Sequence, residues 1–380
     1  MKYRKFGRLD WEPSALGFGA MRLPIVGDDS SNIDEPLAIE MIRYAIDHGV
    51  NYVDSAYGYH GGNSERIVGK ALKDGYREKV KLATKMPTWL TKSYDDFDRY
   101  LNEQLEKLQT DRIDFYLLHG LNKQRWPVLE PLDVTGWAET AIADGRIGHI
   151  GFSFHDDLET FKKIVDYYDW TFCQIQYNYM DTEYQAGTEG LRYAAAKGLA
   201  FVIMEPIAGG RLAVPPPLDI QSIWEEADVK RTPAEWALQW VWNQPEVSVV
   251  LSGMTAMQHV VENVESAGRS GVGTLTEKEL ELVARVQEKY GELGFIGCTE
   301  CRYCQPCPEG VVIPEIFSLV NEFYASDRDD AVKARYAEEI PEDARASKCV
   351  RCGACEELCP QNLPIRNLLK NATRTFEGRR

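Results

Sequence analysis

Short apolar runs alternate with longer amphipathic stretches from about residue 10 to residue 265 of the chain. The apolar runs are rich in β-branched and aromatic residues and cover residues 14–19, 50–54, 80–85, 113–119, 147–153, 172–178, 199–205 and 247–253. Between them, apolar positions recur every three or four residues, as in "EPLAIEMIRYAIDHG" at residues 35–49, which is typical of a helix packed on one face. Nearly continuous apolar strands that alternate with helices indicate parallel strands buried on both sides.

Eight such units within about 250 residues predict an α/β fold of the (β/α)8 TIM barrel type. The alternative is an open, doubly wound sheet, whose first strand is usually followed by a G-x-G-x-x-G turn. No such motif follows residues 14–19, so the pattern favours the barrel.

The helical pattern continues beyond the eighth run. The stretch "TEKELELVARVQEKYG" predicts a capped helix over residues 276–291 that ends at Gly291, and we place a domain boundary there. This gives a barrel over residues 1–290 and a second domain over residues 291–380. Residues 314–346 of the second domain are expected to be mostly helical, and the last ten residues are expected to fray.

Composition and charge narrow the function. The 380 residues are 44% hydrophobic and 27% charged, which is typical of globular proteins, and the formal net charge of −16 disfavours a nucleic-acid partner. The first 24 residues contain no apolar run long enough for a signal peptide or a membrane span, so we expect a cytoplasmic protein that does not bind membranes. Nine cysteines in that compartment are not expected to form disulfides.

Eight of the nine cysteines lie in two runs in the last quarter of the chain, and the ninth, Cys173, fits a buried small hydrophobe. The run "CVRCGACEELCP" has the C-x2-C-x2-C-x3-C-P spacing of ferredoxin-type 4Fe–4S sites, while "CTECRYCQPCP" is one residue shorter before its fourth cysteine. In two-cluster ferredoxins the fourth cysteine of each run binds the other cluster. The expected ligand sets are therefore Cys298, Cys301, Cys304 and Cys359 for one cluster, and Cys349, Cys352, Cys355 and Cys307 for the other.

Two structural zinc sites are the alternative, because four thiolates also suit tetrahedral zinc. Zinc ribbons usually pair two short cysteine knuckles across a longer loop, so four closely spaced cysteines followed by proline favour iron–sulfur clusters. With helices between its two cysteine runs, the region resembles the mainly helical di-cluster ferredoxin domains attached to several oxidoreductases.

Three apolar runs end in an ionisable residue, and the active site of a (β/α)8 barrel lies where its strands end. These residues are Asp54, Lys85 and His119, and Tyr59 follows Asp54 in the loop "SAYGYHGGNSE". With the D-S-A-x-x-Y element, they match the four catalytic residues of the aldo-keto reductase superfamily. Later segments also match: "GFS" (151–153), "QIQYN" (174–178), "MEPIAGG" (204–210) and "VVENV" (260–264). The whole chain resembles the branch of that family with a C-terminal iron–sulfur domain.

The resemblance implies hydride transfer between a nicotinamide and a carbonyl carbon, with Tyr59 giving a proton to the oxygen. A phenol with an ordinary pKa of about 10 is a slow acid near neutrality. A neighbouring ammonium from Lys85 would favour the phenolate and lower that pKa, while Asp54 would pair with the lysine. His119 would orient or polarise the carbonyl oxygen.

The same resemblance implies a cofactor over the barrel mouth. Ser153 and Gln174 would hold its carboxamide, and the full set of expected contacts is Gly19, Ala20, Met21, Asp54, Ser153, Gln174, Met204, Pro206, Ser252, Gly253, Glu262 and Asn263. Two positions depart from the family pattern, because Phe154 replaces the usual asparagine and Met204 replaces the usual stacking aromatic. Trp89 and Trp126 are candidates for the substrate pocket, with ordinary packing as the alternative.

Cofactor choice depends on cations near Ser252 to Asn263. Residues 247–268 contain no lysine or arginine, so a 2′-phosphate would lack charge-assisted partners there, and Glu262 could accept a hydrogen bond from a ribose hydroxyl. This favours NADH over NADPH, with Arg211 and Arg269 as the other cations that could reach the site.

Three functions fit these motifs. The first is a reductase of small carbonyl or alcohol substrates whose two clusters exchange electrons with a ferredoxin or another redox partner. The second is an electron-transfer or interaction protein in which the barrel serves as a docking scaffold. The third is a reductase whose clusters only hold a small domain together. No sequence signal for a bound flavin links the two-electron hydride step to the one-electron clusters.

Overall fold

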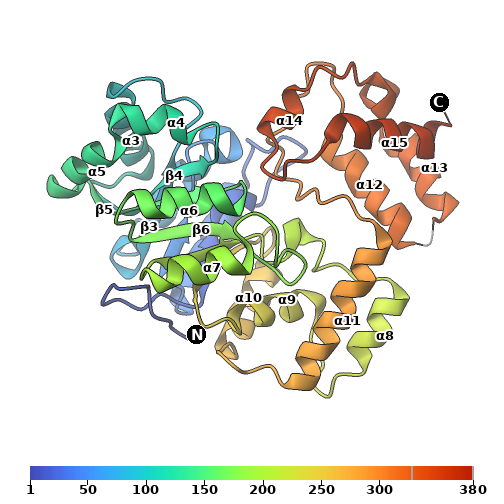
Figure 1. Ribbon diagram of the computed structural model, residues 1–380, viewed down its shortest axis with the longest axis horizontal. Helices are drawn as coiled ribbons and strands as arrows, with labels where there is room; N and C mark the ends of the chain where they lie inside the picture. The colour runs from blue at the N-terminus through green and yellow to red at the C-terminus, as the bar shows by residue number, and fades with distance from the viewer. Residues whose placement is uncertain (327, 379–380) are drawn as a thin grey trace. The chain divides into compact units, whose positions relative to one another are not determined.

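The computed structural model describes residues 1–326 and 328–378. It divides into two compact units, one formed by Met1–Pro206 with Leu238–Thr274 and the other by Ile207–Ala237 with Leu275–Arg380. The first unit contains eight strands, which form a closed, all-parallel barrel in chain order (Figure 1). Their bounds are β1 Leu16–Gly19, β2 Tyr52–Asp54, β3 Lys81–Met86, β4 Ile113–Leu121, β5 Ile147–Phe154, β6 Phe172–Gln176, β7 Ala200–Met204 and β8 Val247–Gly253. The barrel and its strand positions confirm the sequence-based prediction.

Helices surround the barrel, and their apolar stripes face the strands. The helices of this layer are α1 Glu35–Asp47, α2 Ser64–Ala71, α3 Asp95–Leu108, α4 Trp126–Leu129, α5 Val134–Ala143, α6 Leu158–Tyr167, α7 Gly187–Ala196, α9 Pro233–Trp242 and α10 Met257–Gly268. Side chains cap several of them: Asp34 accepts from the Leu37 amide at the start of α1, and Asp157 accepts from the Thr160 amide at the start of α6. Among the short 3-10 helices, η1 at Ala20–Arg22 follows β1 and η2 at Tyr59–Gly62 follows β2.

Aromatic side chains fill the amino-terminal end of the barrel. Phe6, from the segment before β1, is fully buried, and its ring centroid lies 4.8 Å from that of Phe115 and 5.8 Å from that of Phe172. Tyr52 and Val249 belong to the same cluster. This end is therefore a packed core, and the polar residues that end the strands lie at the opposite, carboxyl end.

The second unit is helical in its described part. It contains α8 Leu218–Glu225, α11 Glu277–Leu293, α12 Ile313–Ala325, α13 Asp330–Glu339, α14 Ala354–Leu358 and α15 Ile365–Glu377. A capping box of Thr276 and Glu279 starts α11. The helices between the two cysteine runs were predicted. None of the helices in residues 1–326 and 328–378 is long and apolar enough to span a bilayer.

Two predicted boundaries in this unit were wrong. Helix α11 does not end at Gly291 but continues to Leu293, and Gly294 ends it with a left-handed φ of 66°. The chain also does not fray from residue 371, because α15 extends to Glu377. The Glu377 carboxylate accepts hydrogen bonds from the Tyr336 hydroxyl and the Ser347 amide, which hold the last turn in place. The final two residues of the predicted frayed tail lie outside the described residues.

Candidate functional site

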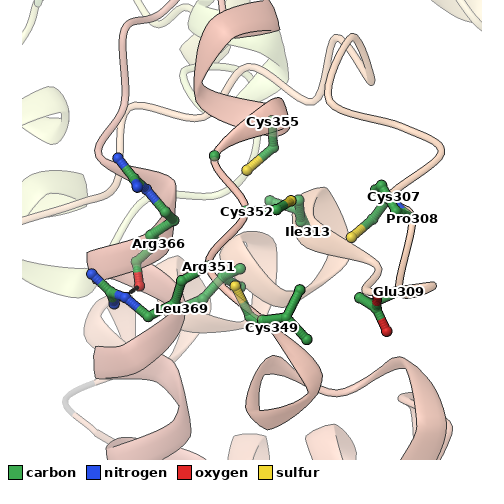
Figure 2. A pocket seen from close by; sticks show the side chains of 12 residues that line it. Cys307, Pro308, Glu309, Ile313, Cys349, Arg351, Cys352, Cys355, Arg366 and Leu369 are labelled. Carbon is green, nitrogen blue, oxygen red and sulfur yellow. Dashed lines mark hydrogen bonds between the residues drawn. The ribbon is translucent and has the colours of Figure 1, made fainter.

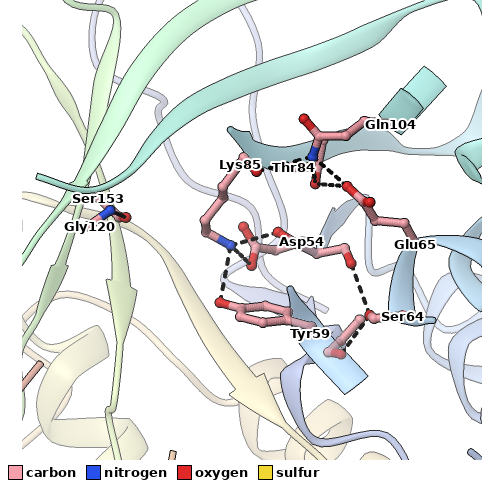
Figure 3. A network of polar contacts seen from close by, with 11 residues as sticks. Asp54, Tyr59, Ser64, Glu65, Thr84, Lys85, Gln104, Gly120 and Ser153 are labelled. Atoms are coloured by element: carbon pink, nitrogen blue, oxygen red, sulfur yellow. Dashed lines mark hydrogen bonds and ion pairs between the residues drawn. The ribbon is translucent and has the colours of Figure 1, made fainter. Parts of the chain in front are cut away.

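Four polar side chains lie together at the carboxyl end of the barrel, and Figure 3 shows three of them, Asp54, Tyr59 and Lys85. Lys85 Nζ, from β3, donates hydrogen bonds to Asp54 Oδ1 at 2.5 Å and to the Ser55 carbonyl at 2.8 Å. The same nitrogen lies 3.5 Å from the hydroxyl of Tyr59, the first residue of η2. The Tyr59 ring meets the His119 ring from β4 edge-on, with centroids 5.9 Å apart. The structure thus brings together the three side chains that the sequence placed at strand ends and Tyr59 from the adjacent loop.

Burial sets the electrostatics of this group. It raises the pKa of the Asp54 carboxyl against the attraction of Lys85, and it lowers the pKa of the Lys85 ammonium against the attraction of Asp54. Burial, together with repulsion from Lys85, also holds the pKa of His119 well below 6.5. The imidazole is therefore neutral near pH 7, and it can donate a hydrogen bond through one ring nitrogen.

A second layer of buried polar groups supports Lys85. Glu65, fully buried in α2, accepts hydrogen bonds from Thr84 Oγ1 at 2.6 Å and from Gln104 Nε2 at 2.5 Å. Gln104 Nε2 also donates to the Lys85 carbonyl at 3.1 Å, and the Tyr116 hydroxyl donates to Gln104 Oε1 at 2.7 Å. These bonds fix the backbone of β3 at the lysine, and the Glu65 charge raises the pKa of Lys85.

Sequence reasoning did not single out Glu65, although the sequence contained a signal. Glu65, Val68 and Leu72 recur at three- and four-residue spacing, so the carboxylate lies on the buried stripe of α2 rather than on its outer face. An acid on an apolar stripe needs buried partners, and Thr84 and Gln104 provide them.

The residues expected to hold a carboxamide lie side by side on β5 and β6. Ser153 pairs with Gln174 in the strand register, and Ser153 Oγ accepts a hydrogen bond from the Gly120 amide at 2.7 Å. Gln174 Oε1 is buried and has no hydrogen-bond partner within the described residues. A buried acceptor of this kind is normally satisfied, and the N–H groups of a carboxamide are suitable donors. The residues therefore fit the nicotinamide group that they are expected to bind.

The strand pair β1 and β8 carries further expected contacts. Gly19 pairs with Gly253, and Ala20 and Met21 follow directly in η1. Carbon atoms of the Arg22 side chain lie 3.1 Å from the position that a Cβ on residue 253 would take. Sequence reasoning missed Arg22, although its position next to Met21 was the available signal. It is a cation close to the strand end where none was expected.

The remaining expected contacts lie near the ends of β7 and β8. Met204 is the last residue of β7, and Pro206 lies two residues beyond it. Asn263 Nδ2 on α10 donates to Ser252 Oγ at 3.0 Å, which ties the helix to the end of β8. Glu262 is exposed on the same helix.

Three aromatic residues singled out in the sequence, Phe154, Trp89 and Trp126, lie in different surroundings. Phe154 is fully buried and packs against Phe161, so it belongs to the core between β5 and α6. Trp89 is exposed, and its ring centroid lies 5.1 Å from that of His119. Trp126 is buried against a neighbouring tyrosine ring, which is the packing alternative.

Arg211 and Arg269, the other two cations considered for the cofactor site, lie in different parts of the structure. Arg211 belongs to the second compact unit, where its guanidinium donates to the carbonyl of Ile296 at 3.2 Å. Arg269 forms the C-cap of α10.

The eight clustered cysteines line two cavities in the second unit. One, of about 320 Å³ and partly open to solvent, is lined by Cys298, Cys301, Cys304 and Cys359. The other, of about 330 Å³ and also partly open, is lined by Cys307, Cys349, Cys352 and Cys355 (Figure 2). In each cavity three cysteines of one run meet the fourth cysteine of the other run, which is the exchange expected from the spacing. Apolar side chains such as Ile313 and Phe317 pack behind the thiols.

The two cysteine loops repeat one backbone pattern. Glu300 and Arg351, each two residues after the first cysteine of its run, have left-handed φ values of 54° and 60°. Arg302 and Gly353, each directly after the second cysteine, have φ values of 62° and 88°. Successive turns of this kind point backbone N–H groups into a concavity, and the Glu300 amide donates to Cys298 Sγ at 3.5 Å.

The burial and pKa of the thiols distinguish the isolated Cys173 from the eight clustered cysteines. Cys173 is fully buried, and burial raises the pKa of its thiol well above the usual value, as expected for a packing residue. Burial also raises the pKa of the Cys298 and Cys355 thiols to about 11. Metal binding would have to displace these protons. Over residues 1–326 and 328–378, no three His, Cys, Asp or Glu side chains lie close enough to hold a single metal ion.

Comparison with known proteins gives two family matches. The model of the aldo/keto reductase family matches residues 15–288, and the model of the 4Fe–4S dicluster domain matches residues 297–363. Among curated relatives, the aldo-keto reductase YhdN of Bacillus subtilis is 31% identical over 56% of this chain and 64% of its own length. The NADH-specific methylglyoxal reductase of Escherichia coli is 27% identical over 70% of this chain and 93% of its own length.

Solved structures show the same barrel. The holo form of the aldo-keto reductase AKR11C1 from Bacillus halodurans is 28% identical, with a TM-score of 0.64 over 75% of this chain and 96% of that chain. An aldo/keto reductase from Klebsiella pneumoniae, in complex with NADP and acetate, is 25% identical, with a TM-score of 0.61 over 75% of this chain and 95% of that chain.

Proposed function

Because the chain belongs to the aldo/keto reductase family and carries a 4Fe–4S dicluster domain, we propose that it is a carbonyl reductase with two redox clusters. It transfers a hydride between a nicotinamide cofactor and a small carbonyl or alcohol substrate. Two 4Fe–4S clusters exchange single electrons with a redox partner. The proposed domains are residues 1–290 for the reductase barrel and 291–380 for the cluster domain.

The observation that carries the hydride-transfer proposal is the position of one amine. Lys85 Nζ lies between the Asp54 carboxylate at 2.5 Å and the Tyr59 hydroxyl at 3.5 Å, in a buried site. A bound nicotinamide supplies the hydride. Tyr59 holds the proton that the substrate oxygen receives, and the ammonium stabilises the phenolate left behind. The neutral His119 lies against the Tyr59 ring and donates a hydrogen bond to the same substrate oxygen.

The residues assigned to the cofactor follow from the strand ends. Gln174 and Ser153 orient the carboxamide, and the unsatisfied Gln174 Oε1 supports this assignment. Gly19, Ala20 and Met21 border the ribose, and the residues from Met204 to Pro206 and from Ser252 to Asn263 complete the site.

We favour NADH as the cofactor. Residues 247–268 have no cation, and the E. coli relative is named as NADH-specific. Arg22 is the one cation that the structure adds beside Gly253, so it is the residue that would allow NADPH to bind.

The cluster proposal is supported by the two lined cavities and by the repeated loop geometry. Each cavity has four cysteines, and the left-handed residues recur at equivalent places in the two runs. Reduced thiolate ligands of this kind suit the cytoplasm, where we place the protein. The packing of apolar residues behind the cysteines also suits the alternative in which the clusters only stabilise the domain.

The hydride-transfer proposal is tested by Tyr59→Phe in the anaerobically purified holoprotein, with NADH and methylglyoxal as probe substrates. The variant keeps the ring and loses the proton donor, so kcat should fall about 10²- to 10⁴-fold. The matched control is Tyr57→Phe, because the Tyr57 hydroxyl donates to Glu103 outside the four-residue group. Unchanged turnover in Tyr59→Phe would exclude a tyrosine acid, and a wild-type protein without turnover would favour the scaffold alternative.

The cluster proposal needs a separate measurement. Iron and sulfide analysis should give about eight of each per chain, as two 4Fe–4S clusters require. An anaerobic redox titration then separates the alternatives, since clusters that no physiological donor can reduce would be structural.

A further inference from the structure

Helix α15 has one apolar and one cationic face. Ile365, Leu369 and Ala372 are buried against the second unit. Asn367, Lys370, Asn371 and Arg374 follow one another at three- and four-residue spacing on the opposite face, and all four are exposed. The Arg351 guanidinium, from the second cysteine run, extends this face by donating to Asn367 Oδ1 at 3.1 Å and to the Arg366 carbonyl at 3.2 Å. We call Arg351, Lys370 and Arg374 the basic strip.

Within the described residues the basic strip forms no close ion pairs, although the Glu356 carboxylate attracts Arg351 electrostatically. None of its three side chains makes an ion pair within the part of the chain that the structure describes. The acid of the same helix, Glu377, is turned toward Tyr336 and Ser347, and the neighbouring Arg366 is paired with Glu356 at 2.6 Å. Such a strip is unusual in a chain with 59 acidic and 43 basic residues. It gathers three cations on one surface of a protein whose formal net charge is −16.

The strip begins at the cysteine cavity of Figure 2. Arg351 directly precedes Cys352, which is exposed, while the other seven cysteines of the two cavities are only partly exposed. Val350, which lines the same cavity, is 61% exposed. Glu309 is the acid among the lining residues of this cavity. An exposed apolar residue beside a polar rim is typical of interfaces between proteins.

We propose that the basic strip, together with Val350, docks an acidic protein that carries single electrons. The cluster held by Cys307, Cys349, Cys352 and Cys355 is the one that exchanges the electron with it. In this step the reduced carrier is oxidised by one electron and the cluster is reduced by one. No bond forms or breaks, and no proton moves. The inference rests on the proposed function, because it requires redox-active clusters.

Charge complementarity is the reason for an acidic partner. Opposite charges steer encounter and raise association rates 10- to 10³-fold, and salt screens the effect. At physiological ionic strength the Debye length is about 8 Å, so steering depends on charges near the contact. Lys370 and Arg374 supply two of the three charges and lie outside the cysteine loops, so they can be changed without touching a ligand.

The test uses the double variant K370Q/R374Q of the holoprotein and a chemically reduced acidic ferredoxin. The second-order rate constant for reduction of the clusters, measured by anaerobic stopped-flow absorbance at low salt, should fall about tenfold. The difference should vanish at high salt. The matched control is K5Q/K73Q, which removes two exposed cations of the first unit and should leave the rate unchanged.

Further measurements distinguish a docking defect from damage to the clusters and from failure of the proposed redox function. Iron content and the EPR-monitored midpoint potentials should be the same in all variants, and reduction by the small donor methyl viologen should not slow. Equal ferredoxin rates in wild type and K370Q/R374Q would overturn the docking proposal while leaving the clusters redox-active. Clusters that accept electrons from neither donor would overturn the proposed redox function and the docking proposal with it.

Discussion

The pair formed by Asp54 and Lys85 allows a quantitative prediction. Its side chains are 3% and 1% exposed, and the two charges are 2.5 Å apart. Removing one partner of a buried pair leaves the other charge uncompensated, which typically costs about 3–5 kcal/mol. Replacing both partners with neutral groups of similar size is often close to neutral. We therefore expect Asp54→Asn to lower the free energy of unfolding by about 3–5 kcal/mol at pH 7. The double variant D54N/K85M should regain most of that stability.

The pH dependence of the free energy of unfolding tests whether the stability lost in Asp54→Asn comes from the charge of Lys85. Burial lowers the pKa of Lys85 in the folded state below 10.5, and loss of Asp54 lowers it further. Between the folded and unfolded pKa values the unfolded chain binds more protons, so stability rises with pH in that window. Each pH unit in the window is worth about 1.4 kcal/mol. Between pH 7 and pH 9.5, the free energy of unfolding of Asp54→Asn should therefore rise by up to about 3 kcal/mol relative to that of D54N/K85M.

The assay is a urea titration followed by tryptophan fluorescence under anaerobic conditions. All nine tryptophans lie before residue 243, so the signal reports the barrel region and not the cysteine-rich domain. The double variant is the matched control, because it differs from Asp54→Asn only at residue 85. If Asp54→Asn is no less stable than D54N/K85M at pH 7, Lys85 is not a buried charge that depends on Asp54.

Three further predictions follow from the site. Glu65→Gln removes a negative charge that raises the pKa of Lys85. The alkaline limb of the pH profile of kcat should therefore shift to lower pH. An unchanged profile would show that Glu65 acts only in packing. His119 is kept neutral by burial, so kcat/KM should show no inflection from an imidazole between pH 6 and 8, and a break near pH 6.5 would contradict this assignment. Cys307→Ser should damage the cluster bound by Cys349 and its run, and quantitative EPR should show one intact cluster; loss of the signal from the cluster of Cys298 instead would refute the exchange.

The barrel could be predicted because its signal is periodic and local. Strands buried on both faces are nearly continuous apolar runs, and each of the eight runs matches a strand within two residues at either end. The strand ends then placed Asp54, Lys85 and His119 together without any knowledge of side-chain contacts. The cysteine exchange followed in the same way from spacing.

Features that depend on tertiary contacts were harder to predict. Gly291 looked like a helix end, but Gly294 has the left-handed φ that ends α11. The polar C-terminal tail looked frayed, because the contacts of Glu377 with Tyr336 and Ser347 join residues 30 or more positions apart. The sequence analysis did not single out Glu65, because its buried partners Thr84 and Gln104 lie 19 and 39 positions away along the chain.

The proposed function combines two kinds of electron chemistry, the two-electron transfer of a hydride and the one-electron reduction of a 4Fe–4S cluster, which need a mediator between them. The four-residue group at the barrel mouth suits a hydride, which moves two electrons at once between closed-shell partners. A 4Fe–4S cluster accepts one electron at a time. Two clusters would therefore still need a mediator that takes up the two electrons of a hydride and releases them one by one. A substrate that tolerates a radical, or a flavin brought by a partner, would provide it. We proposed the basic strip as the docking surface for a single-electron carrier, and it lies beside the cavity that contains the exposed Cys352, so the cluster of that cavity is the proposed point of one-electron exchange.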